Sequence, residues 1–415
     1  MRISPWLLLF CVAAAAGLVF AGQSTYDFVQ HLDRDVHAIT CGYFPGLSAP
    51  DASGATGCHK TLMSPYSSVL RSTRWGGLPI SLPAMGVFAF LLFRGLDLAF
   101  NRADDERAPR IFLVAAAALP VLTSLVFGYI ALVELDAACK MCIGIYVSSF
   151  VAFAAAIAEL LTSRPALGAE LGLADAGQAP DDASPVRAHA LSFAQGVGFV
   201  VIPALIYAGT MPSYDKYVGA CGELSKPGDP NGVMIDLDER DAGRASIEVF
   251  DPLCSSCRSM EARLEASGLA EQLDRKGVLF PLDSACNWMS DATHPGACAV
   301  SEAVLCAGKD APAVIAWSFE RQSEIMAAEK AAVGSAAAMV GEAFPNLKAC
   351  VGSNAVKARL NKSMRWVVSN QLPVLTPQLF VDGTKLCDAD TDIGIDYALS
   401  RLIARAPSAA AGEER

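Results

Sequence analysis

Two pairs of cysteines in this chain have C-x-x-C spacing, which suits reversible disulfide chemistry. Cys254 and Cys257 stand in "FDPLCSSCRSM", between a segment typical of a strand and one typical of a helix. A helix N-terminus stabilises a thiolate and lowers its pKa, so we expect Cys254 to be the exposed nucleophile and Cys257 the resolving thiol. A structural disulfide and half of a zinc site are the alternatives, although a zinc site needs two more ligands nearby. Redox exchange is the favoured interpretation.

The second pair, Cys139 and Cys142, stands in "ACKMCIGIYV", where an apolar segment begins. On a helix this spacing places both thiols on one face, with Cys142 about 4.5 Å deeper along the axis. The deeper thiol can meet a lipid-soluble oxidant, while the shallower one stays within reach of an aqueous partner. Close helix packing and palmitoylation are the alternatives. Palmitoylation usually lies on the cytoplasmic side, which conflicts with the topology inferred below.

A third pair lies upstream, with Cys41 in "ITCGYFPG" and Cys58 in "ATGCHKTLMSPYS". The segment between them is rich in Gly, Pro, Ser and Ala, so we expect it to be mobile. A disulfide closing this loop would stabilise the fold by about 3 kcal/mol through the chain entropy that it removes from the unfolded state. A structural staple is therefore one interpretation. The other is a relay, in which the loop exchanges disulfides with the pair at the membrane edge.

The composition predicts a membrane protein that works in an oxidising compartment. Of the 415 residues, 53% are hydrophobic and only 18% are charged, which is too apolar for an ordinary soluble protein. The formal net charge of -11 offers no basic face, so nucleic acid is not expected as a partner. The 13 cysteines indicate a compartment in which disulfides persist. The sequence contains no motif for a metal or a nicotinamide cofactor.

Five apolar runs approach the roughly 20 residues that cross a bilayer. They are residues 5–22, 77–96, 111–135, 142–161 and 190–211. Arginines gather in the loops after the second and fourth runs, which makes those loops cytoplasmic by the positive-inside rule. The three cysteine pairs then face outward together. The first run also fits a cleaved signal peptide, because Arg2, an apolar core and "FAG" follow that pattern.

From about residue 243 the pattern changes to that of a soluble α/β domain. "RASIEVF" (244–250) and "GVLFPLDS" (277–284) are typical of strands, and the segment between them is typical of a helix. A helical stretch follows from about 297 to 370, and "TPQLFVDGTKL" then predicts two strands joined by an Asp-Gly turn. A helix near 392–405 closes the chain. This order is expected of a thioredoxin-like domain with a helical insertion.

Six further cysteines of the soluble part are expected to form structural disulfides. They are Cys221, Cys286, Cys298, Cys306, Cys350 and Cys387. Six cysteines allow fifteen pairings, and proximity alone suggests Cys286 with Cys298 and Cys306 with Cys350. The histidines have no metal-ligand spacing and are expected to be ordinary surface or core residues; they include His31, His37, His59 and His294.

Residues 243–405 resemble the thioredoxin superfamily, and within it the DsbA-like periplasmic branch. The resemblance rests on "CSSC", on "LTPQLFVDG" and on "HPGACAVSEAVLCA" at the start of the helical insertion. It implies that Thr376 and Pro377 form the cis-proline loop that faces the active cysteines, so Pro377 joins the candidate site. The tryptophan that thioredoxins proper carry before the first cysteine is Leu253 here.

The first half, about residues 8–161, resembles the vitamin K epoxide reductase family, and the whole chain resembles its bacterial form with a fused thioredoxin-like domain. The motifs are Cys41, Cys58, Ser64 in "MSPYSSVL", "GGLPISLPAMG" and "CKMC". The loop cysteines stand farther apart than is usual in that family.

The resemblance implies a role for each of these residues. Cys142 would face a quinone, either ubiquinone or menaquinone, and Cys139 would exchange with the outer loop. Cys41 and Cys58 would shuttle electrons. Ser64 would position the quinone oxygen, and its alternative role is an ordinary helix N-cap.

The predicted fold class is a membrane all-α domain, a four-helix transmembrane bundle plus a fifth linking helix, followed by an α/β thioredoxin-like domain with a helical insertion. The expected divisions are a vitamin K epoxide reductase-like domain (1–161), a cytoplasmic linker (162–189), the fifth transmembrane helix (190–211), an extracytoplasmic connector (212–242), the thioredoxin-like domain (243–405) and a disordered tail (406–415).

The sequence thus predicts a quinone-dependent thiol oxidase that forms disulfides in exported proteins. Electrons would pass from reduced exported proteins to the soluble C-x-x-C pair, then to the loop cysteines, the membrane pair and the quinone. We expect a monomer in the bacterial inner membrane, spanning the lipid bilayer several times, with its thioredoxin-like domain in the periplasm. The alternatives are a quinone or epoxide reductase that uses thiols as donor, and a membrane-anchored binding protein whose disulfides are all structural.

Overall fold

The computed structural model describes residues 4–35, 39–42, 57–100, 107–162, 185–238 and 243–405. The chain divides into two compact units. The helical unit comprises Met1–Leu62, Tyr66–Val69 and Leu78–Pro212, and the sheet unit comprises Met63–Pro65, Leu70–Gly77 and Ser213–Arg415. Most of the predicted linker (162–189) and all of the predicted tail (406–415) lie outside the described residues.

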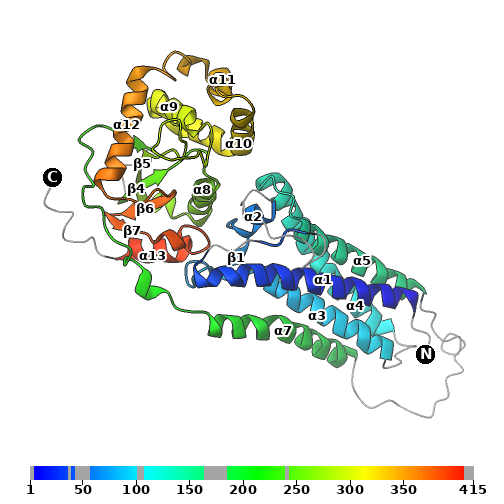
Figure 1. Ribbon diagram of the computed structural model, residues 1–415. Coiled ribbons are helices and arrows are strands. Elements are labelled where there is room, and N and C mark those ends of the chain that lie inside the picture. Colours follow the sequence, from blue (N-terminus) through cyan, green and yellow to red (C-terminus); the bar gives the residue numbers. More distant parts are fainter. Residues whose placement is uncertain are drawn as a thin grey trace, which may run out of the picture. The chain divides into compact units, whose positions relative to one another are not determined.

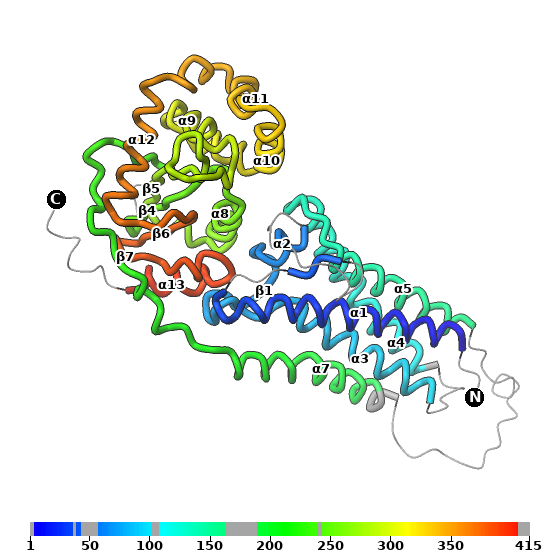
Figure 2. Tube along the Cα trace, viewed as in Figure 1, coloured from blue at the N-terminus to red at the C-terminus, as the bar shows by residue number. Residues whose placement is uncertain are grey.

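Five long apolar helices build the helical unit (Figures 1 and 2). They are α1 (Pro5–Gln30), α3 (Ser81–Phe100), α4 (Arg107–Tyr129), α5 (Lys140–Thr162) and α7 (Pro185–Thr210). Each is long and apolar enough to cross a membrane, so the five predicted spans are present as helices. Helix α1 continues past the predicted end at residue 22, because the polar segment that follows contains no proline and buries Thr25 and Asp27.

Small residues let these helices pack closely. A Cβ on Gly17 of α1 would lie 2.3 Å from the Phe88 ring of α3, and one on Gly95 would lie 2.8 Å from Cys11 Sγ. Helix α1 packs against both α3 and α5, and Phe10 is fully buried, so the bundle core depends on α1.

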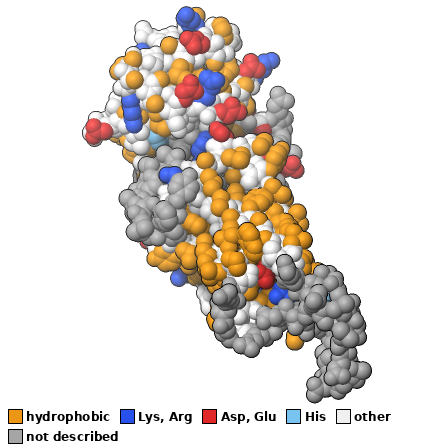
Figure 3. Space-filling view, turned by 90° about the vertical axis from the view of Figure 1, so that its right-hand side faces the viewer, with side chains coloured by type: hydrophobic (Ala, Val, Ile, Leu, Met, Phe, Trp, Pro, Cys, Tyr) orange, Lys and Arg blue, Asp and Glu red, His pale blue; other side chains and the backbone are white. Residues whose placement is uncertain are grey.

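Apolar side chains cover the outside of the same bundle. Figure 3 shows them as a broad hydrophobic area over the helical unit. They include Leu119, Leu122, Leu125 and Val126 of α4, each more than half exposed. A water-soluble protein rarely exposes so large an apolar area, which indicates that lipid surrounds this unit.

Short elements connect the long helices. They are the 3-10 helix η1 (His31–Asp33), helix α2 (Gly57–Leu62), the antiparallel strands β1 (Ser68–Val69) and β2 (Leu78–Pro79), and a π-helical turn, η2 (Ile130–Glu134). The π-helical turn ends α4 just before the chain reaches Cys139 and the start of α5.

A five-stranded mixed sheet forms the centre of the sheet unit, in the order β3-β5-β4-β6-β7. The strands are β3 (Ile235–Asp236), β4 (Arg244–Phe250), β5 (Leu273–Leu279), β6 (Gln378–Val381) and β7 (Thr384–Lys385). Strands β4 and β5 are parallel, and β6 joins them antiparallel with β7 as its hairpin partner. With a helix crossing from β4 to β5 and a terminal helix after the hairpin, this is the thioredoxin-like topology that the sequence predicted.

Six helices complete the sheet unit. They are α8 (Ser255–Ser267), α9 (Ala297–Ala307), α10 (Ala311–Ala331), α11 (Ser335–Ala343), α12 (Asn354–Ser369) and α13 (Ile395–Ala404). Four of them, α9 to α12, lie between β5 and β6 in the chain and form the predicted helical insertion. Figure 1 shows α9, α10 and α11 grouped together.

The strands of the sheet bury alternate side chains on opposite faces. On one face, Val249 of β4, Val278 of β5 and Phe380 of β6 pack with Val367 of α12 in one hydrophobic cluster. On the other, Glu248 of β4 is buried and paired with Arg275 (3.1 Å).

Two pieces of the segment that follows α2 pack within the sheet unit. The buried guanidinium of Arg263 on α8 donates to the carbonyl oxygens of Met63 (2.5 Å) and Ser64 (3.1 Å). The indole N–H of Trp75 donates to Asp390 (2.6 Å). These contacts join residues 63–65 and 70–77 to the sheet unit.

Candidate functional site

The soluble C-x-x-C pair lies at the start of helix α8. Cys254 is the N-cap residue and Cys257 lies in the first turn. The chain turns into the helix here because Asp251 accepts hydrogen bonds from the N–H of Leu253 at its carboxylate (2.7 Å) and from the N–H of Cys254 at its carbonyl (3.0 Å). Cys254 is 4% exposed and Cys257 0%, so the first thiol is less accessible than the sequence predicted.

The two thiols of this pair differ in acidity. The pKa of Cys254 is lowered to about 6, chiefly by a hydrogen bond from the Cys257 thiol; burial opposes the shift, and Thr376 and the charge of His294 add to it. Burial and the neighbouring Cys254 raise the pKa of Cys257 well above its usual range. At neutral pH Cys254 is therefore mainly a thiolate and Cys257 a thiol, as disulfide exchange requires.

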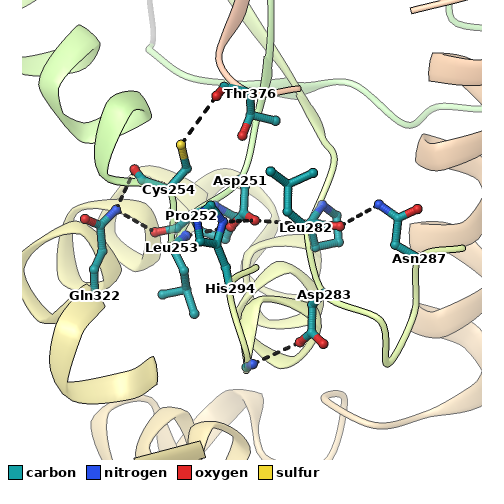
Figure 4. A network of polar contacts seen from close by, with 12 residues as sticks. Asp251, Pro252, Leu253, Cys254, Leu282, Asp283, Asn287, His294, Gln322 and Thr376 are labelled. Atoms are coloured by element: carbon teal, nitrogen blue, oxygen red, sulfur yellow. Dashed lines mark hydrogen bonds and ion pairs between the residues drawn. The ribbon is translucent and has the colours of Figure 1, made fainter. Parts of the chain in front are cut away.

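Thr376 contacts the side chain of Cys254, and Gln322 contacts its backbone (Figure 4). Cys254 Sγ lies 3.5 Å from the carbonyl oxygen of Thr376, whose peptide bond to Pro377 is cis. The Gln322 amide of α10 donates to the carbonyl oxygens of Pro252 (3.3 Å) and Cys254 (2.8 Å). The segment that contains Pro377 thus lies beside Cys254.

The membrane-edge pair repeats this arrangement in the helical unit. Cys139 immediately precedes Lys140, the first residue of α5, and the N–H of Cys142 donates to Cys139 Sγ (3.2 Å). The pKa of Cys139 is lowered to about 7, chiefly by a hydrogen bond from the Cys142 thiol; burial opposes the shift, and Thr61 and the first N–H groups of α5 add to it. Cys139 is buried, whereas Cys142 is half-buried.

A short helix brings the loop disulfide towards the membrane pair. Cys41 and Cys58 are joined, with their Cα atoms 5.7 Å apart, and Cys58 lies in α2. The first residue of α2, Gly57, comes so close to the segment just before α5 that a Cβ there would lie 2.5 Å from the carbonyl oxygen of Ala138. Only glycine permits this approach.

Thr61 links the loop disulfide to the membrane pair more directly. Its hydroxyl donates to the carbonyl oxygen of Cys58 (3.0 Å) and lies 4.0 Å from Cys142 Sγ. The loop cysteine therefore stands between two residues, Gly57 and Thr61, that contact the segment carrying the membrane pair.

Ser64, the predicted quinone contact, lies among residues of the sheet unit. Ser64 is 6% exposed and belongs to the sheet unit, where its carbonyl oxygen accepts from Arg263, so its contact with a quinone stays a prediction.

The structure forms three further disulfides, Cys221–Cys387, Cys286–Cys298 and Cys306–Cys350, which include the two pairs that proximity suggested. Over the residues that the structure describes, no group of three His, Cys, Asp or Glu side chains could hold a metal.

The helical unit carries the loop disulfide Cys41–Cys58. It also carries the C-x-x-C pair of Cys139 and Cys142 at the start of a membrane-spanning helix. Residues 8–157 match the model of the vitamin K epoxide reductase family. The match confirms the resemblance predicted from the cysteines of the first half, and this vitamin K epoxide reductase-like segment contains Cys41, Cys58, Cys139 and Cys142. A comparison with curated proteins finds no match.

Two solved structures are similar to this chain. They are the crystal structure of reduced DsbA1 from Neisseria meningitidis and a structure of the oxidoreductase NmDsbA1 from N. meningitidis. Each is 16% identical and matches 44% of this chain, over 91% and 90% of its own length, with TM-scores of 0.30 and 0.25. The fold assignment rests on the strand order and on the place of the C-x-x-C pair.

Several residues beside the thiols were missed by sequence reasoning. Gly57, Thr61, Asp251 and Gln322 were not singled out, and His294 was expected to be ordinary, although its Nδ1 lies 2.8 Å from an Asp251 oxygen. The one available signal was that Thr61 follows Cys58 by almost one helical turn. The family match and the two reactive cysteine pairs together support a thiol–disulfide oxidoreductase.

Proposed function

We propose that this protein is a quinone-dependent thiol oxidase that forms disulfides in exported proteins. The observation that carries the proposal is that both units contain one reactive arrangement, a cysteine immediately before the first residue of a helix and a second cysteine three residues later. The first thiol has a lowered pKa in each case, about 6 for Cys254 and about 7 for Cys139. Structural disulfides have no need of acidic thiols, whereas a relay does.

A reduced client protein delivers electrons to the sheet unit. A client thiolate attacks Cys254 of the oxidised pair, the bond from Cys254 to Cys257 breaks, and the electron pair passes to Cys257, which takes up a proton. A second client thiolate attacks the client sulfur of the mixed disulfide and releases Cys254 as a thiolate. The client gains one disulfide, and Cys254 and Cys257 are left reduced.

The loop cysteines reoxidise this pair by the same chemistry. The Cys254 thiolate attacks the Cys41–Cys58 disulfide, and Cys257 resolves the mixed disulfide, so that two electrons and two protons move to the loop. The loop dithiol then reduces the disulfide of the membrane pair. Thr61 supports this step because its hydroxyl contacts both Cys58 and Cys142.

The membrane pair suits a lipid-soluble acceptor. Cys142 is half-buried at the start of a membrane-spanning helix, and the half-buried Tyr146 lies one turn deeper on the same face. When bound, a quinone accepts the two electrons and two protons that Cys139 and Cys142 release on forming their disulfide. Ubiquinone and menaquinone share this chemistry. Ser64 remains a proposed contact of the quinone oxygen.

The proposal includes a location and a domain plan. Arginine-rich loops after the second and fourth spans would face the cytoplasm, which places both C-x-x-C pairs on the periplasmic side of a bacterial inner membrane. The fifth span would link a vitamin K epoxide reductase-like domain (1–161) to a thioredoxin-like domain (243–405). We propose that the chain works as a monomer.

The purified protein tests the proposal directly. In detergent or lipid, it should reduce ubiquinone or menaquinone with a dithiol peptide as donor, followed by the absorbance of the quinone. Cys142→Ala should abolish this activity, whereas Cys11→Ala, which removes a free cysteine outside the relay, should leave it unchanged. Quinone reduction that persists in Cys142→Ala would contradict the path.

A further inference from the structure

Two arginines bind a short segment from the first half of the chain within the sheet unit. Arg263 of α8, which is fully buried, donates to the carbonyl oxygens of Met63 (2.5 Å) and Ser64 (3.1 Å). Arg71 donates to the carbonyl oxygen of the next residue, Pro65. Three consecutive carbonyl oxygens therefore accept hydrogen bonds from two guanidinium groups, and we call this arrangement the arginine clamp.

One carboxylate joins the two arginines of the clamp. Asp396 of α13 is 4% exposed and lies 3.5 Å from Arg263 Nη1 and 3.7 Å from Arg71 Nε. Burying such charges costs free energy, and apolar residues of similar volume often stabilise a fold equally well. The charged cluster is therefore better explained by the position that it imposes on the bound segment than by stability alone.

The bound segment follows the loop disulfide directly in the chain. Met63 comes after Leu62, the last residue of α2, and Cys58 is the second residue of that helix. At about 1.5 Å per residue along the helix, Cys58 stands on the order of 10 Å from Met63. On α8, Arg263 follows Cys257 by six residues, which corresponds to about 9 Å along the helix axis. Each end of the clamp is thus one or two helical turns from a cysteine of the proposed relay.

The clamp shortens the tether between the loop disulfide and the sheet unit. With the clamp closed, Cys58 is five residues from the attachment at Met63. With the clamp open, the attachment at Trp75 remains, where the indole N–H donates to Asp390 (2.6 Å), seventeen residues from Cys58. The effective concentration of tethered groups falls roughly as the −3/2 power of tether length, so opening the clamp should lower it about sixfold.

We propose that the arginine clamp, through Arg263 and Arg71, is the positioning device for electron transfer from the soluble C-x-x-C pair to the loop disulfide. The inference deepens the proposed function and rests on it for the identity of that step. The Cys254 thiolate attacks the loop disulfide, and Cys257 loses its proton and displaces the loop sulfur by attacking Cys254. The loop gains two electrons and two protons, one proton balancing that lost by Cys257 and one coming from water.

Alkylation of the full-length protein at successive times tests the clamp. Cys139→Ala with Cys142→Ala stops the electrons at the loop, and one equivalent of a dithiol peptide starts the reaction. Acid quenching, alkylation and mass spectrometry then give two rates. The Cys254 thiol appears in the client step, and the Cys58 thiol appears in the transfer step.

The variants open the clamp without changing a cysteine. Arg71→Gln with Arg263→Met removes both guanidinium groups, so the transfer step should slow about sixfold while the client step keeps the parent rate. Arg263→Lys loses the planar fork that spans two carbonyl oxygens, but Arg71 still holds Pro65, so the transfer step should slow about twofold. Arg321→Gln removes a cation from an exposed ion pair and should change neither step.

Two results overturn the inference. One is a folded double variant whose transfer step is as fast as in the parent. The other is equal slowing of both steps, which indicates general damage to the sheet unit rather than lost positioning. If the double variant fails to fold, Arg263→Lys decides by the same two rates, and an unchanged transfer step then overturns the inference. Neither step uses quinone, so a negative result leaves the proposed function standing, and an absence of quinone reduction would leave both rates measurable.

Discussion

The acidity of each nucleophilic thiol depends on its partner cysteine. For both Cys254 and Cys139, the hydrogen bond from the second cysteine contributes most to the lowered pKa. The second cysteine thus has two roles, because it first holds its partner as a thiolate and later closes the disulfide with it. The helix N-terminus assists at Cys139, where the N–H of Cys142 points at the sulfur.

This dual role predicts the effect of replacing Cys257. A hydrogen bond to a charged group contributes about 1.5–3 kcal/mol, so Cys257→Ala should raise the pKa of Cys254 from about 6 by roughly one to two units. Below its pKa Cys254 is protonated and unreactive, so iodoacetamide labelling at pH 6–7 should slow. Cys257→Ser keeps a donor and should shift the profile less. Identical profiles for the alanine variant and the parent would refute the role.

Thr61 is predicted to couple the loop to the membrane pair. Thr61→Val keeps the shape of the side chain but removes the hydroxyl that contacts Cys58 and Cys142. One hydrogen bond contributes about 0.5–1.5 kcal/mol, so quinone reduction should slow by roughly twofold to tenfold. Thr61→Ser is the matched control and should retain the parent rate. Equal rates for all three proteins would show that the hydroxyl has no part in the transfer.

The sequence revealed the cysteine pairs but not their supporting residues, because the two kinds of information differ in range. C-x-x-C is a local pattern, so Cys254 with Cys257 could be recognised directly. Thr61 and Cys142 are 81 positions apart, and Asp251 and His294 are 43 apart. Such contacts depend on how the chain folds back, which no local pattern encodes.

The strands were predicted best where the sequence contains residues typical of a tight turn. Asp382 and Gly383 both have positive φ, which is the geometry that an Asp-Gly hairpin requires, and the two strands flank them as expected. Strand β5 instead runs over Leu273–Leu279, earlier than the predicted 277–284. Its charged first half is not typical of a strand, but parallel pairing with all of β4 holds it in the sheet.

Helix α2 offers a test of the close approach between elements. Gly57→Ala places a Cβ against the carbonyl oxygen of Ala138, so α2 must move away from the segment that leads into α5. Overpacking of this kind costs about 1–3 kcal/mol, and quinone reduction should fall by roughly tenfold. Gly209→Ala in α7 is the control, because a Cβ there meets nothing within 4 Å. A Gly57→Ala protein as active as this control would mean that α2 need not dock this closely.

Helix α8 depends on a buried cation. Arg263→Ala leaves the Met63 and Ser64 carbonyls without this donor and removes one of the two arginines paired with Asp396, so that Arg71 at 3.7 Å stays. Breaking a buried pair costs about 3–5 kcal/mol, so the free energy of unfolding of the sheet unit, measured in urea, should decrease by that amount. Arg321→Ala, in an exposed pair, should change the free energy of unfolding by about 0.5 kcal/mol at most. Similar decreases in the free energy of unfolding for the two variants would contradict this role of Arg263.

Across the whole molecule, one chain carries two kinds of cysteine pair. Four cysteines in two C-x-x-C pairs are thiols, whereas the extra pairs of the sheet unit are closed disulfides. The predicted domains are contiguous stretches, but the sheet unit also takes in residues 63–65 and 70–77. No local pattern in the sequence indicates this, because it depends on the contacts that Arg263 and Trp75 make with residues far away along the chain.

Graded reduction of the oxidised protein separates a relay from a purely structural set of disulfides. A disulfide breaks faster when its leaving thiol has a low pKa, so the Cys254–Cys257 and Cys139–Cys142 bonds should open at the lowest dithiothreitol concentrations. Cys221–Cys387, Cys286–Cys298 and Cys306–Cys350 should persist to concentrations roughly tenfold higher or more, as expected for structural bonds. Mass-spectrometric mapping of alkylated thiols after each step gives the order. If all pairs open together, the protein is better described as a membrane-anchored binding protein, because a relay requires that its exchanging bonds yield before those that hold the fold.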